Sequence, residues 1–181
     1  MHVLKSLLLG AITLIVILGV ISISLPRQIH LQRDIIINAP AEVAFEQLSD
    51  VRNWPKWLPG YQIDSGKSAR FAGTHVGARY NWTSQRRGIG ESIVTIVAAE
   101  PPSRLVTNLE FEKANKAHST FVLEETDEGT KLTWHFEQYT GDNPIRKFSG
   151  LLIDSTIGEE FEDGLANIKK EVESKYVLTD N

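Results

Sequence analysis

The sequence predicts an α+β protein: a curved antiparallel β-sheet wrapped around one long C-terminal α-helix, preceded by a single transmembrane helix. Three patterns predict this arrangement. The first is an uncharged apolar run from Ser6 to Leu25. The second is a series of alternating segments joined by short turns between residues 61 and 140. The third is an apolar position every three to five residues from Phe148 to Val172.

The N-terminal run is long enough to cross a bilayer. It holds about 20 uncharged residues, which matches the thickness of the hydrocarbon core at the helical rise, and Pro26 and Arg27 end it. A cleaved signal peptide is the alternative, because Ser22 and Ser24 have the small-x-small spacing that a peptidase accepts. The run exceeds the usual apolar region of a signal peptide, which is about 7–15 residues. We therefore expect residues 1–27 to be an uncleaved membrane anchor.

The charges that flank this run bear on its orientation. Lys5 and the terminal amine favour a cytoplasmic N-terminus, with the following domain on the far side of the membrane. Arg27 and Arg33 lie just after the run and favour the reverse. We expect a single-pass protein with its N-terminus in the cytoplasm, and the opposite orientation stays open.

The chain after the anchor begins with a strand and a short helix. Residues 28–38 alternate apolar and polar side chains with a period of two, which is typical of a β-strand. Ala39-Pro40-Ala41-Glu42 favours a helix start, since proline suits the first turn and glutamate suits the positive helix end. Residues 50–59 contain two prolines, so we expect a short turn-rich piece there, pinned by Trp54 and Trp57.

Strands and turns dominate the sequence from residue 61 to 140. Residues 91–99 are rich in β-branched side chains, which favour strands, and Pro101-Pro102-Ser103 interrupts them. Asp127-Glu128-Gly129 marks a further turn. Strands joined by such short turns pair as an antiparallel meander. The positions that alternate are Tyr80 and Trp82; Leu105, Thr107, Leu109 and Phe111; Ser119, Phe121 and Leu123; and Leu132, Trp134 and Phe136.

The C-terminal part has the pattern of one amphipathic helix. Asn143-Pro144 is a typical helix start. Gly150, Gly158 and Gly164 lie within the pattern; each costs about 1 kcal/mol against alanine in a helix, but each allows a kink or a close approach to the sheet. We expect one domain over residues 28–177 and a frayed tail over 178–181. The apolar face consists of Phe148, Leu152, Ile157, Phe161, Leu165, Ile168 and Val172.

The composition excludes several kinds of protein. The net charge is −4, from 19 Lys and Arg against 23 Asp and Glu, and a nucleic-acid partner would require a basic face. The chain has no cysteine, which excludes disulfide scaffolds, thiolate metal sites and cysteine nucleophiles. The histidines follow no metal-binding spacing, so we expect neither a metal nor a cofactor. The composition does not indicate an oligomeric state.

Several stretches carry a resemblance to a known family. They are IIINAPAEVAFEQLSDVRNWPKW from Ile35, VGARYNWTS from Val76, GIGESIVTIVAAEPPSRL from Gly88, EGTKLTWHFE from Glu128 and EEFEDGLANIKKEVE from Glu159. Together they resemble the polyketide cyclase/dehydrase branch of the START-like (SRPBCC, helix-grip) superfamily, over residues 28–176. The resemblance implies a helix-grip fold. It does not imply one activity, because the superfamily includes lipid carriers, hormone receptors and cyclases.

The candidate ligand-binding residues are mostly aromatic. A curved sheet with one helix across its concave face leaves space between them, which is where such a fold binds a small hydrophobic molecule. For any single aromatic residue, core packing is the commoner role. Tryptophan and tyrosine also carry a polar group that needs a partner when buried, which favours Tyr80, Trp82 and Trp134 as ligand contacts. The full candidate set is Trp57, Tyr80, Trp82, Glu91, Phe111, Phe121 and Trp134.

Glu91 is the one candidate for a catalytic residue. It lies in phase with Ile93 and Thr95, and if this phase faces the cavity, burial would raise the pKa of Glu91 and suit it to acid–base chemistry. The opposite phase, which contains Val94, is equally apolar and leaves the choice open. A Glu91 that faces solvent would instead pair with Arg86 or Arg87, a contact worth little.

These observations leave three hypotheses for function. The favoured one is a membrane-tethered protein that binds, and in one version transports, a lipid or other small hydrophobic molecule. The second is a cyclase or dehydratase for a polyketide-like or aromatic substrate, which would fold its substrate with few polar groups. The third is a protein-interaction module that holds no ligand. Binding is favoured over catalysis because the sequence contains no evident acid–base pair.

Overall fold

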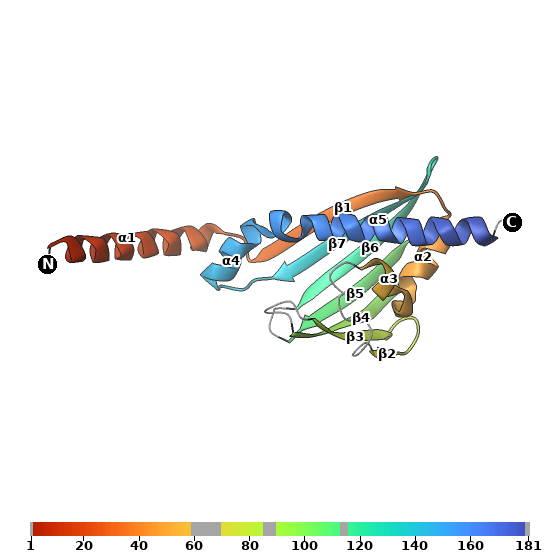
Figure 1. Ribbon diagram of the computed structural model, residues 1–181, viewed down its shortest axis with the longest axis horizontal. Coiled ribbons are helices and arrows are strands. Elements are labelled where there is room, and N and C mark those ends of the chain that lie inside the picture. Colours follow the sequence, from red (N-terminus) through yellow and green to blue (C-terminus); the bar gives the residue numbers. More distant parts are fainter. Residues whose placement is uncertain (1, 59–69, 85–89, 113–115, 180–181) are drawn as a thin grey trace.

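The structure is a computed structural model that describes residues 2–58, 70–84, 90–112 and 116–179. Figure 1 shows an N-terminal helix, α1 (His2–Ser24), that projects from one end of an antiparallel sheet, and a long C-terminal helix, α5 (Ile153–Thr179), that lies along the sheet. The predicted fold class is confirmed: a curved antiparallel sheet is packed on a long helix and preceded by an apolar helix.

The sheet has seven strands in the order β1-β7-β6-β5-β4-β3-β2. The first strand of the chain pairs with the last, Gln28 opposite Tyr139 and Ile37 opposite Thr130, so the meander ends beside its beginning. The three-residue strand β2 extends the far edge and was not predicted as a separate element. The bounds are β1 (Gln28–Ile37), β2 (Arg70–Ala72), β3 (Arg79–Ser84), β4 (Gly90–Glu100), β5 (Arg104–Phe111), β6 (Ala117–Thr126) and β7 (Gly129–Tyr139).

Short helices connect β1 to the far edge of the sheet. They are α2 (Ala41–Ser49), a 3-10 turn η1 (Val51–Asn53) and α3 (Trp54–Trp57). Pro40 is the N-cap residue of α2, and Glu42 lies in its first turn, as the sequence predicts. The turn-rich piece after α2 buries both of its tryptophans, Trp54 and Trp57.

The C-terminal pattern forms two helices where the sequence predicts one. The helix α4 (Pro144–Leu151) starts at the expected place, with the side chain of Asn143 accepting a hydrogen bond from the Arg146 N–H. It ends at Leu152, whose backbone (φ −102°, ψ 5°) leaves the helical range and whose N–H bonds to Ser149 at 3.1 Å. The expectation that Leu152 lies on the buried face was wrong: its side chain is 62% exposed. The break turns α4 away from the axis of α5.

Two glycines in these helices make the expected close approaches to the sheet. A Cβ atom on Gly150 of α4 would lie 2.8 Å from Cγ1 of Ile29 in β1. A Cβ atom on Gly158 of α5 would lie 2.8 Å from Nη2 of Arg33. Glycine at these positions allows both helices to pack directly on the first strand.

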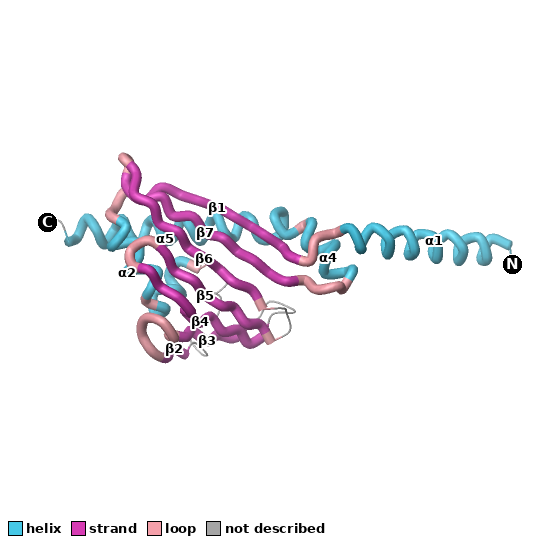
Figure 2. The backbone as a smooth tube through the Cα atoms, turned by 180° about the vertical axis from the view of Figure 1, so that it is seen from behind, coloured by secondary structure: helices cyan, strands magenta, loops and turns pink. Residues whose placement is uncertain are grey.

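The face of the sheet toward α5 forms the core, and we call it the inner face. Its buried side chains pack against Phe161, Leu165, Ile168 and Val172 of α5. Viewed from behind, the other face of the strands, the outer face, is not covered by any helix of the described chain (Figure 2). Any site between a helix and the sheet must therefore lie on the inner face.

The helix α1 contributes almost nothing to this core. Residues Val3–Ser24 have a mean hydropathy of 2.7, and Ser22 is the only one of them that is buried within the structure. Their length and composition suit a membrane span, and they suit a signal sequence equally well. In Figure 1, α1 and the C-terminal end of α5 lie at opposite ends of the molecule.

Candidate functional site

The inner face carries two groups of aromatic side chains. The first group is centred on Trp134, whose ring centroid lies 5.8 Å from that of Trp57, 5.2 Å from Phe121 and 4.1 Å from Phe161. In the second group, Tyr80 stacks on Trp82 at 5.0 Å. The first group is on the β1 side of the sheet and the second on its far edge.

Small and weakly polar side chains lie between the two groups. Ser119 of β6 is opposite Thr107 of β5, and both are buried. The next inward position on β6 is Ala117, which is also buried. A floor of small residues flanked by aromatic walls is typical of a site for a flat or apolar molecule.

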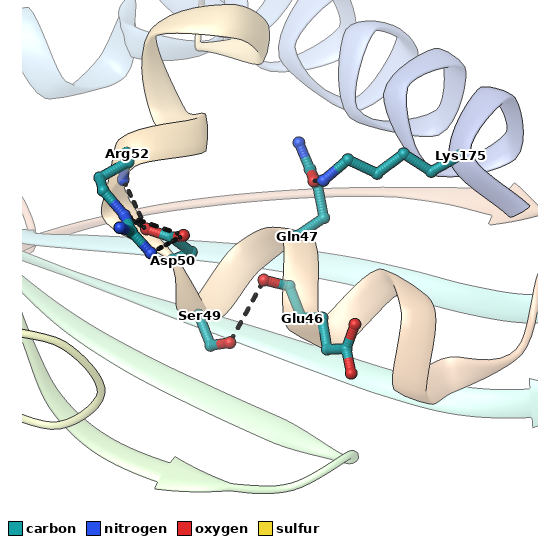
Figure 3. Close-up of polar contacts among 6 residues, drawn as sticks. All are labelled: Glu46, Gln47, Ser49, Asp50, Arg52 and Lys175. Atoms are coloured by element: carbon teal, nitrogen blue, oxygen red, sulfur yellow. Dashed lines mark hydrogen bonds and ion pairs between the residues drawn. The ribbon is translucent and has the colours of Figure 1, made fainter. Parts of the chain in front are cut away.

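The helices before β2 hold Trp57 in place through local polar contacts. The Asp50 carboxylate accepts hydrogen bonds from the backbone N–H and the guanidinium of Arg52, which closes the turn η1 (Figure 3). The Arg52 guanidinium lowers the pKa of Asp50. One turn later, the indole of Trp54 donates to the Leu48 carbonyl at 2.8 Å, so its polar group is satisfied within the same segment.

Two further contacts tie this segment to α5. The Lys175 ammonium of α5 donates to the side-chain oxygen of Gln47 in α2 (Figure 3). The side chain of Asn167 donates to the backbone carbonyl of Trp57 at 3.3 Å. The indole of Trp57 is therefore held between α5 and the sheet by bonds that leave its own N–H unused.

Four buried polar atoms near these aromatic groups have no hydrogen-bond partner among the described residues. They are Nε1 of Trp57, Nε1 of Trp134, the hydroxyl of Tyr80 and the hydroxyl of Ser119. Each of these side chains is at most 5% exposed. Gln47, Asn81 and Thr140 each carry a further such atom. Most buried polar groups in native proteins are paired, so these groups call for partners that the described residues do not supply.

Burial also determines the charge state of Tyr80. Desolvation raises the pKa of its phenol above the ordinary value of 10.0, because a phenolate is costly in an apolar setting. Tyr80 is the one ionisable side chain among the buried inner-face residues of the described strands. It is a neutral hydrogen-bond donor at physiological pH.

Polar bonds on the β1 side clamp α5 to the sheet. Arg33 of β1 forms ion pairs with Asp154 and with Glu162 of α5, the latter at 2.8 Å. Hydrogen bonds to these two carboxylates raise the pKa of Arg33. Lys169 of α5 donates to the Ile36 carbonyl at 2.7 Å. The position of α5 is thus fixed relative to β1.

The structure brings most of the predicted site residues to the inner face. Trp57, Tyr80, Trp82, Phe121 and Trp134 are buried there. Phe111 is half-buried, two residues from buried Leu109 on the same strand and opposite Ser92 of β4. Their role as ligand contacts remains a prediction.

Glu91 lies apart from this group. Its side chain is exposed, and it shares a strand phase with exposed Val97, while Ser92, Val94 and Ile96 of the opposite phase are buried. Of the two phases that the pattern leaves open, the structure has the one with Glu91 on the outer face. The arginines expected beside it, Arg86 and Arg87, lie outside the described residues.

Three residues of the site were missed as site candidates. Ser119 alternates with Phe121 and was recognised only as part of a strand. Phe161 was recognised only as part of the apolar face of the C-terminal helix. Phe71 stacks on Tyr80 at 4.9 Å and lies on β2, the strand that the pattern did not reveal. The strand phase was the available signal for Ser119.

The histidines lie away from the inner face. His118 bonds to Asn108 on β5 at 2.7 Å, and His30 lies 3.6 Å from Glu137 across β1 and β7. Within the ranges that the structure describes, no three His, Asp or Glu side chains are grouped closely enough to hold a metal ion.

A cavity of about 190 Å³ with a mixed polar and apolar lining is at the end of the sheet that is farther from α1. Asp50 and Arg52 line it together with the turn that contains Thr74 and His75. Its volume is below the range of about 300–1,000 Å³ that is usual for small-molecule sites. It is separate from the two aromatic groups of the inner face.

Comparisons with known proteins agree with this architecture. The model of a family described as polyketide cyclase / dehydrase and lipid transport matches residues 28–173. Among curated proteins, none matches the sequence.

Solved structures of similar fold come from several sources. A protein of unknown function from Staphylococcus aureus superposes with a TM-score of 0.62 at 10% identity, over 82% of this chain and 95% of that one. A protein from Chromobacterium violaceum superposes with a TM-score of 0.53 at 19% identity, over 82% and 99%. DynU16, from the dynemicin biosynthetic locus, superposes with a TM-score of 0.55 at 14% identity, over 83% of this chain and 49% of that one. At these identities the likeness shows the fold alone.

Proposed function

The chain belongs to the polyketide cyclase / dehydrase and lipid transport family, and we propose that it is a membrane-tethered protein that binds one small hydrophobic molecule on the inner face of its sheet. The proposed contacts are Trp57, Tyr80, Trp82, Phe111, Phe121 and Trp134, together with Ser119. Glu91 is not included because its side chain is exposed on the outer face.

The unpaired buried polar atoms carry this proposal. A buried donor without a partner costs about 1–3 kcal/mol, and four such atoms belong to side chains buried between the sheet and its helices. An indole N–H can only donate a hydrogen bond. A ligand that offers acceptor oxygens would satisfy Trp57 and Trp134 and remove that cost.

The side chains of the proposed site favour one class of ligand. The aromatic walls favour a molecule with a large apolar surface, and the donors favour one that carries carbonyl, ether or hydroxyl oxygens. An anionic ligand is less suitable, because the buried inner-face residues of the described strands include no cation and an unpaired buried charge is costly. We therefore infer a neutral molecule with a few acceptor oxygens.

The membrane tether would place this site beside a store of apolar molecules. The 22-residue segment Val3–Ser24 is long and apolar enough to span a bilayer. Tethering keeps the site close to lipid-dissolved ligands and raises their effective concentration. Transport of the ligand is one use of such a site.

A cyclase or dehydratase activity is the second candidate. The buried Tyr80 supports it, since a neutral phenol beside a bound carbonyl can donate a proton or stabilise a developing oxyanion. The binding hypothesis is favoured because it requires no such chemistry. Tyr80→Phe distinguishes the two, because it would abolish turnover but only weaken binding.

The test uses the full-length chain purified in lipid nanodiscs. Bound small molecules are extracted and identified by mass spectrometry, and their affinity is then measured by quenching of tryptophan fluorescence. Trp57→Phe and Trp134→Phe keep an aromatic ring at each position, smaller than the indole, and remove the unpaired N–H groups. Trp54→Phe is the matched control, because the Trp54 N–H already bonds to Leu48 within the protein.

We expect Trp57→Phe and Trp134→Phe each to weaken binding by about tenfold, the equivalent of one hydrogen bond of about 1.4 kcal/mol. We expect Trp54→Phe to lower stability but not affinity. A chain that carries no small molecule and binds none from a lipid extract would contradict the proposal and favour the protein-interaction module.

A further inference from the structure

The helix α4 lies beside the last turn of α1. The Lys147 ammonium of α4 donates to the backbone carbonyl of Ser22 at 2.9 Å, and both side chains are only 6% exposed. A cation at this point stabilises the negative end of the α1 helix. The contact fixes α4 at the place where α1 leaves its apolar stretch.

The helix α4 is packed against protein in its middle and leaves large apolar side chains exposed at both of its ends. Gly150 approaches Ile29 of β1, which holds the Lys147 and Gly150 side of the helix against the sheet. Ile145 is 79% exposed and Leu151 is 58% exposed, and Leu152, just after the helix, is 62% exposed. Three large apolar side chains in eight residues are thus presented to the surroundings.

Another exposed side chain belongs to the same end of the molecule. Tyr139 is 54% exposed and ends β7, opposite Gln28, which follows α1 by a few residues. Tyrosine is enriched where a protein crosses from the acyl region of a bilayer to water. Figure 1 shows that α4 and the ends of β1 and β7 all lie at the α1 end of the sheet.

We propose that α4, together with Tyr139 and Leu152, rests on the surface of the same bilayer that α1 crosses. This inference rests on the proposed membrane tether. The geometry leaves little choice of neighbour, because a helix bonded to the last turn of a membrane-spanning segment lies at the level of the lipid headgroups. Amphipathic helices bury their apolar side by about 5–10 Å at that level.

Such a contact would fix the direction in which the domain faces. A single spanning helix followed by a short linker leaves a domain free to tilt. A second contact through α4 would prevent this and would hold one end of the inner face against the lipid. A hydrophobic ligand could then pass between bilayer and site without crossing bulk water.

The experiment uses the absence of cysteine from the chain. Single cysteines are introduced as Ile145→Cys and Leu151→Cys, and as Val97→Cys for control, since Val97 is an exposed apolar residue of β4 on the outer face. Each is labelled with an environment-sensitive fluorophore in the full-length chain. The labelled chains are placed, one per disc, in phosphatidylcholine nanodiscs that contain a lipid with a shallow spin label.

We expect labels at 145 and 151 to emit at shorter wavelength and to be quenched several times more strongly than the label at 97. Equal quenching at all three positions would overturn the proposal. One chain per disc ensures that a second copy cannot produce the signal. Alkaline washing of vesicles tests the tether separately: a chain that is washed off lacks the anchor, whereas a retained chain with equal quenching lacks only the α4 contact.

Discussion

On the outer face of the sheet, polar side chains pair with one another, whereas several on the inner face have no protein partner among the described residues. His118 bonds to Asn108 at 2.7 Å, and Lys116 lies 3.2 Å from Glu110. On the inner face, Trp134 and Ser119 each keep a buried polar atom unpaired. The outer face keeps one such atom, Oδ1 of Asn81, so the two faces differ in the number of buried polar atoms that have no partner among the described residues.

The largest difference between the faces should appear in stability. Phe121→Ala on the inner face removes a side chain that is 1% exposed, and we expect it to lower the free energy of unfolding by about 3–5 kcal/mol. His118→Ala on the same strand removes an exposed side chain and should cost about 1 kcal/mol or less. Urea denaturation of the full chain in detergent measures both. Similar losses in the free energy of unfolding for the two variants would contradict this difference between the faces.

A smaller effect distinguishes paired from unpaired hydroxyls. The Thr130 hydroxyl donates to the Ala39 carbonyl at 2.7 Å in a buried position. We expect Thr130→Val to cost about 1–3 kcal/mol, because it leaves that carbonyl without its donor. Ser119→Ala in ligand-free protein should raise stability by about 1 kcal/mol, because it removes a buried hydroxyl that has no partner among the described residues. A large loss from Ser119→Ala would show that its hydroxyl has a protein partner.

The raised pKa of Tyr80 should be detectable as a loss of stability at alkaline pH. Because burial raises the pKa of Tyr80, the folded chain keeps this proton above pH 10.0 while the unfolded chain loses it. Its contribution to stability is therefore fully present below the unfolded pKa and is lost as the pH rises above it. We expect Tyr80→Phe to show a shallower fall in stability above that pH than the parent chain, as followed by circular dichroism. Identical alkaline profiles would contradict this assignment.

The smallest effect belongs to the exposed ion pairs. Lys116 lies 3.2 Å from Glu110, and both side chains are exposed. We expect Glu110→Gln to change stability by about 0.5 kcal/mol or less, and added salt to remove the difference. A loss that persists at high salt would show that the outer face also contributes to stability.

The sequence predicted the fold more completely than the site. Period-two alternation identified the strands from β3 to β7, and the Asn143-Pro144 start located α4. The spacing of the apolar residues did not reveal the break at Leu152, because the interval from Leu152 to Ile157 also fits one continuous helix. The break depends on contacts of α4 with Ile29 and Ser22, which are distant in sequence.

The candidate site could be predicted only in part. Aromatic identity and strand phase correctly placed Tyr80, Phe121 and Trp134 on the inner face, and their role as ligand contacts stays a prediction. Neither signal could choose the phase of Glu91, because both sides of β4 are apolar. Which side faces α5 depends on strand pairing across the sheet, and hydrogen-bond partners for individual donors depend on the full packing.

The clamp between α5 and β1 has a consequence for how a ligand could enter. Arg33, Lys169 and the bond from the Asn38 N–H to Glu173 all join the helix to the same edge strand. In an opening motion, α5 and β1 would therefore move together as one rigid unit, and the rest of the sheet would rotate about that edge. The space between helix and sheet would then widen at the opposite edge, toward the strands that carry Tyr80 and Phe71.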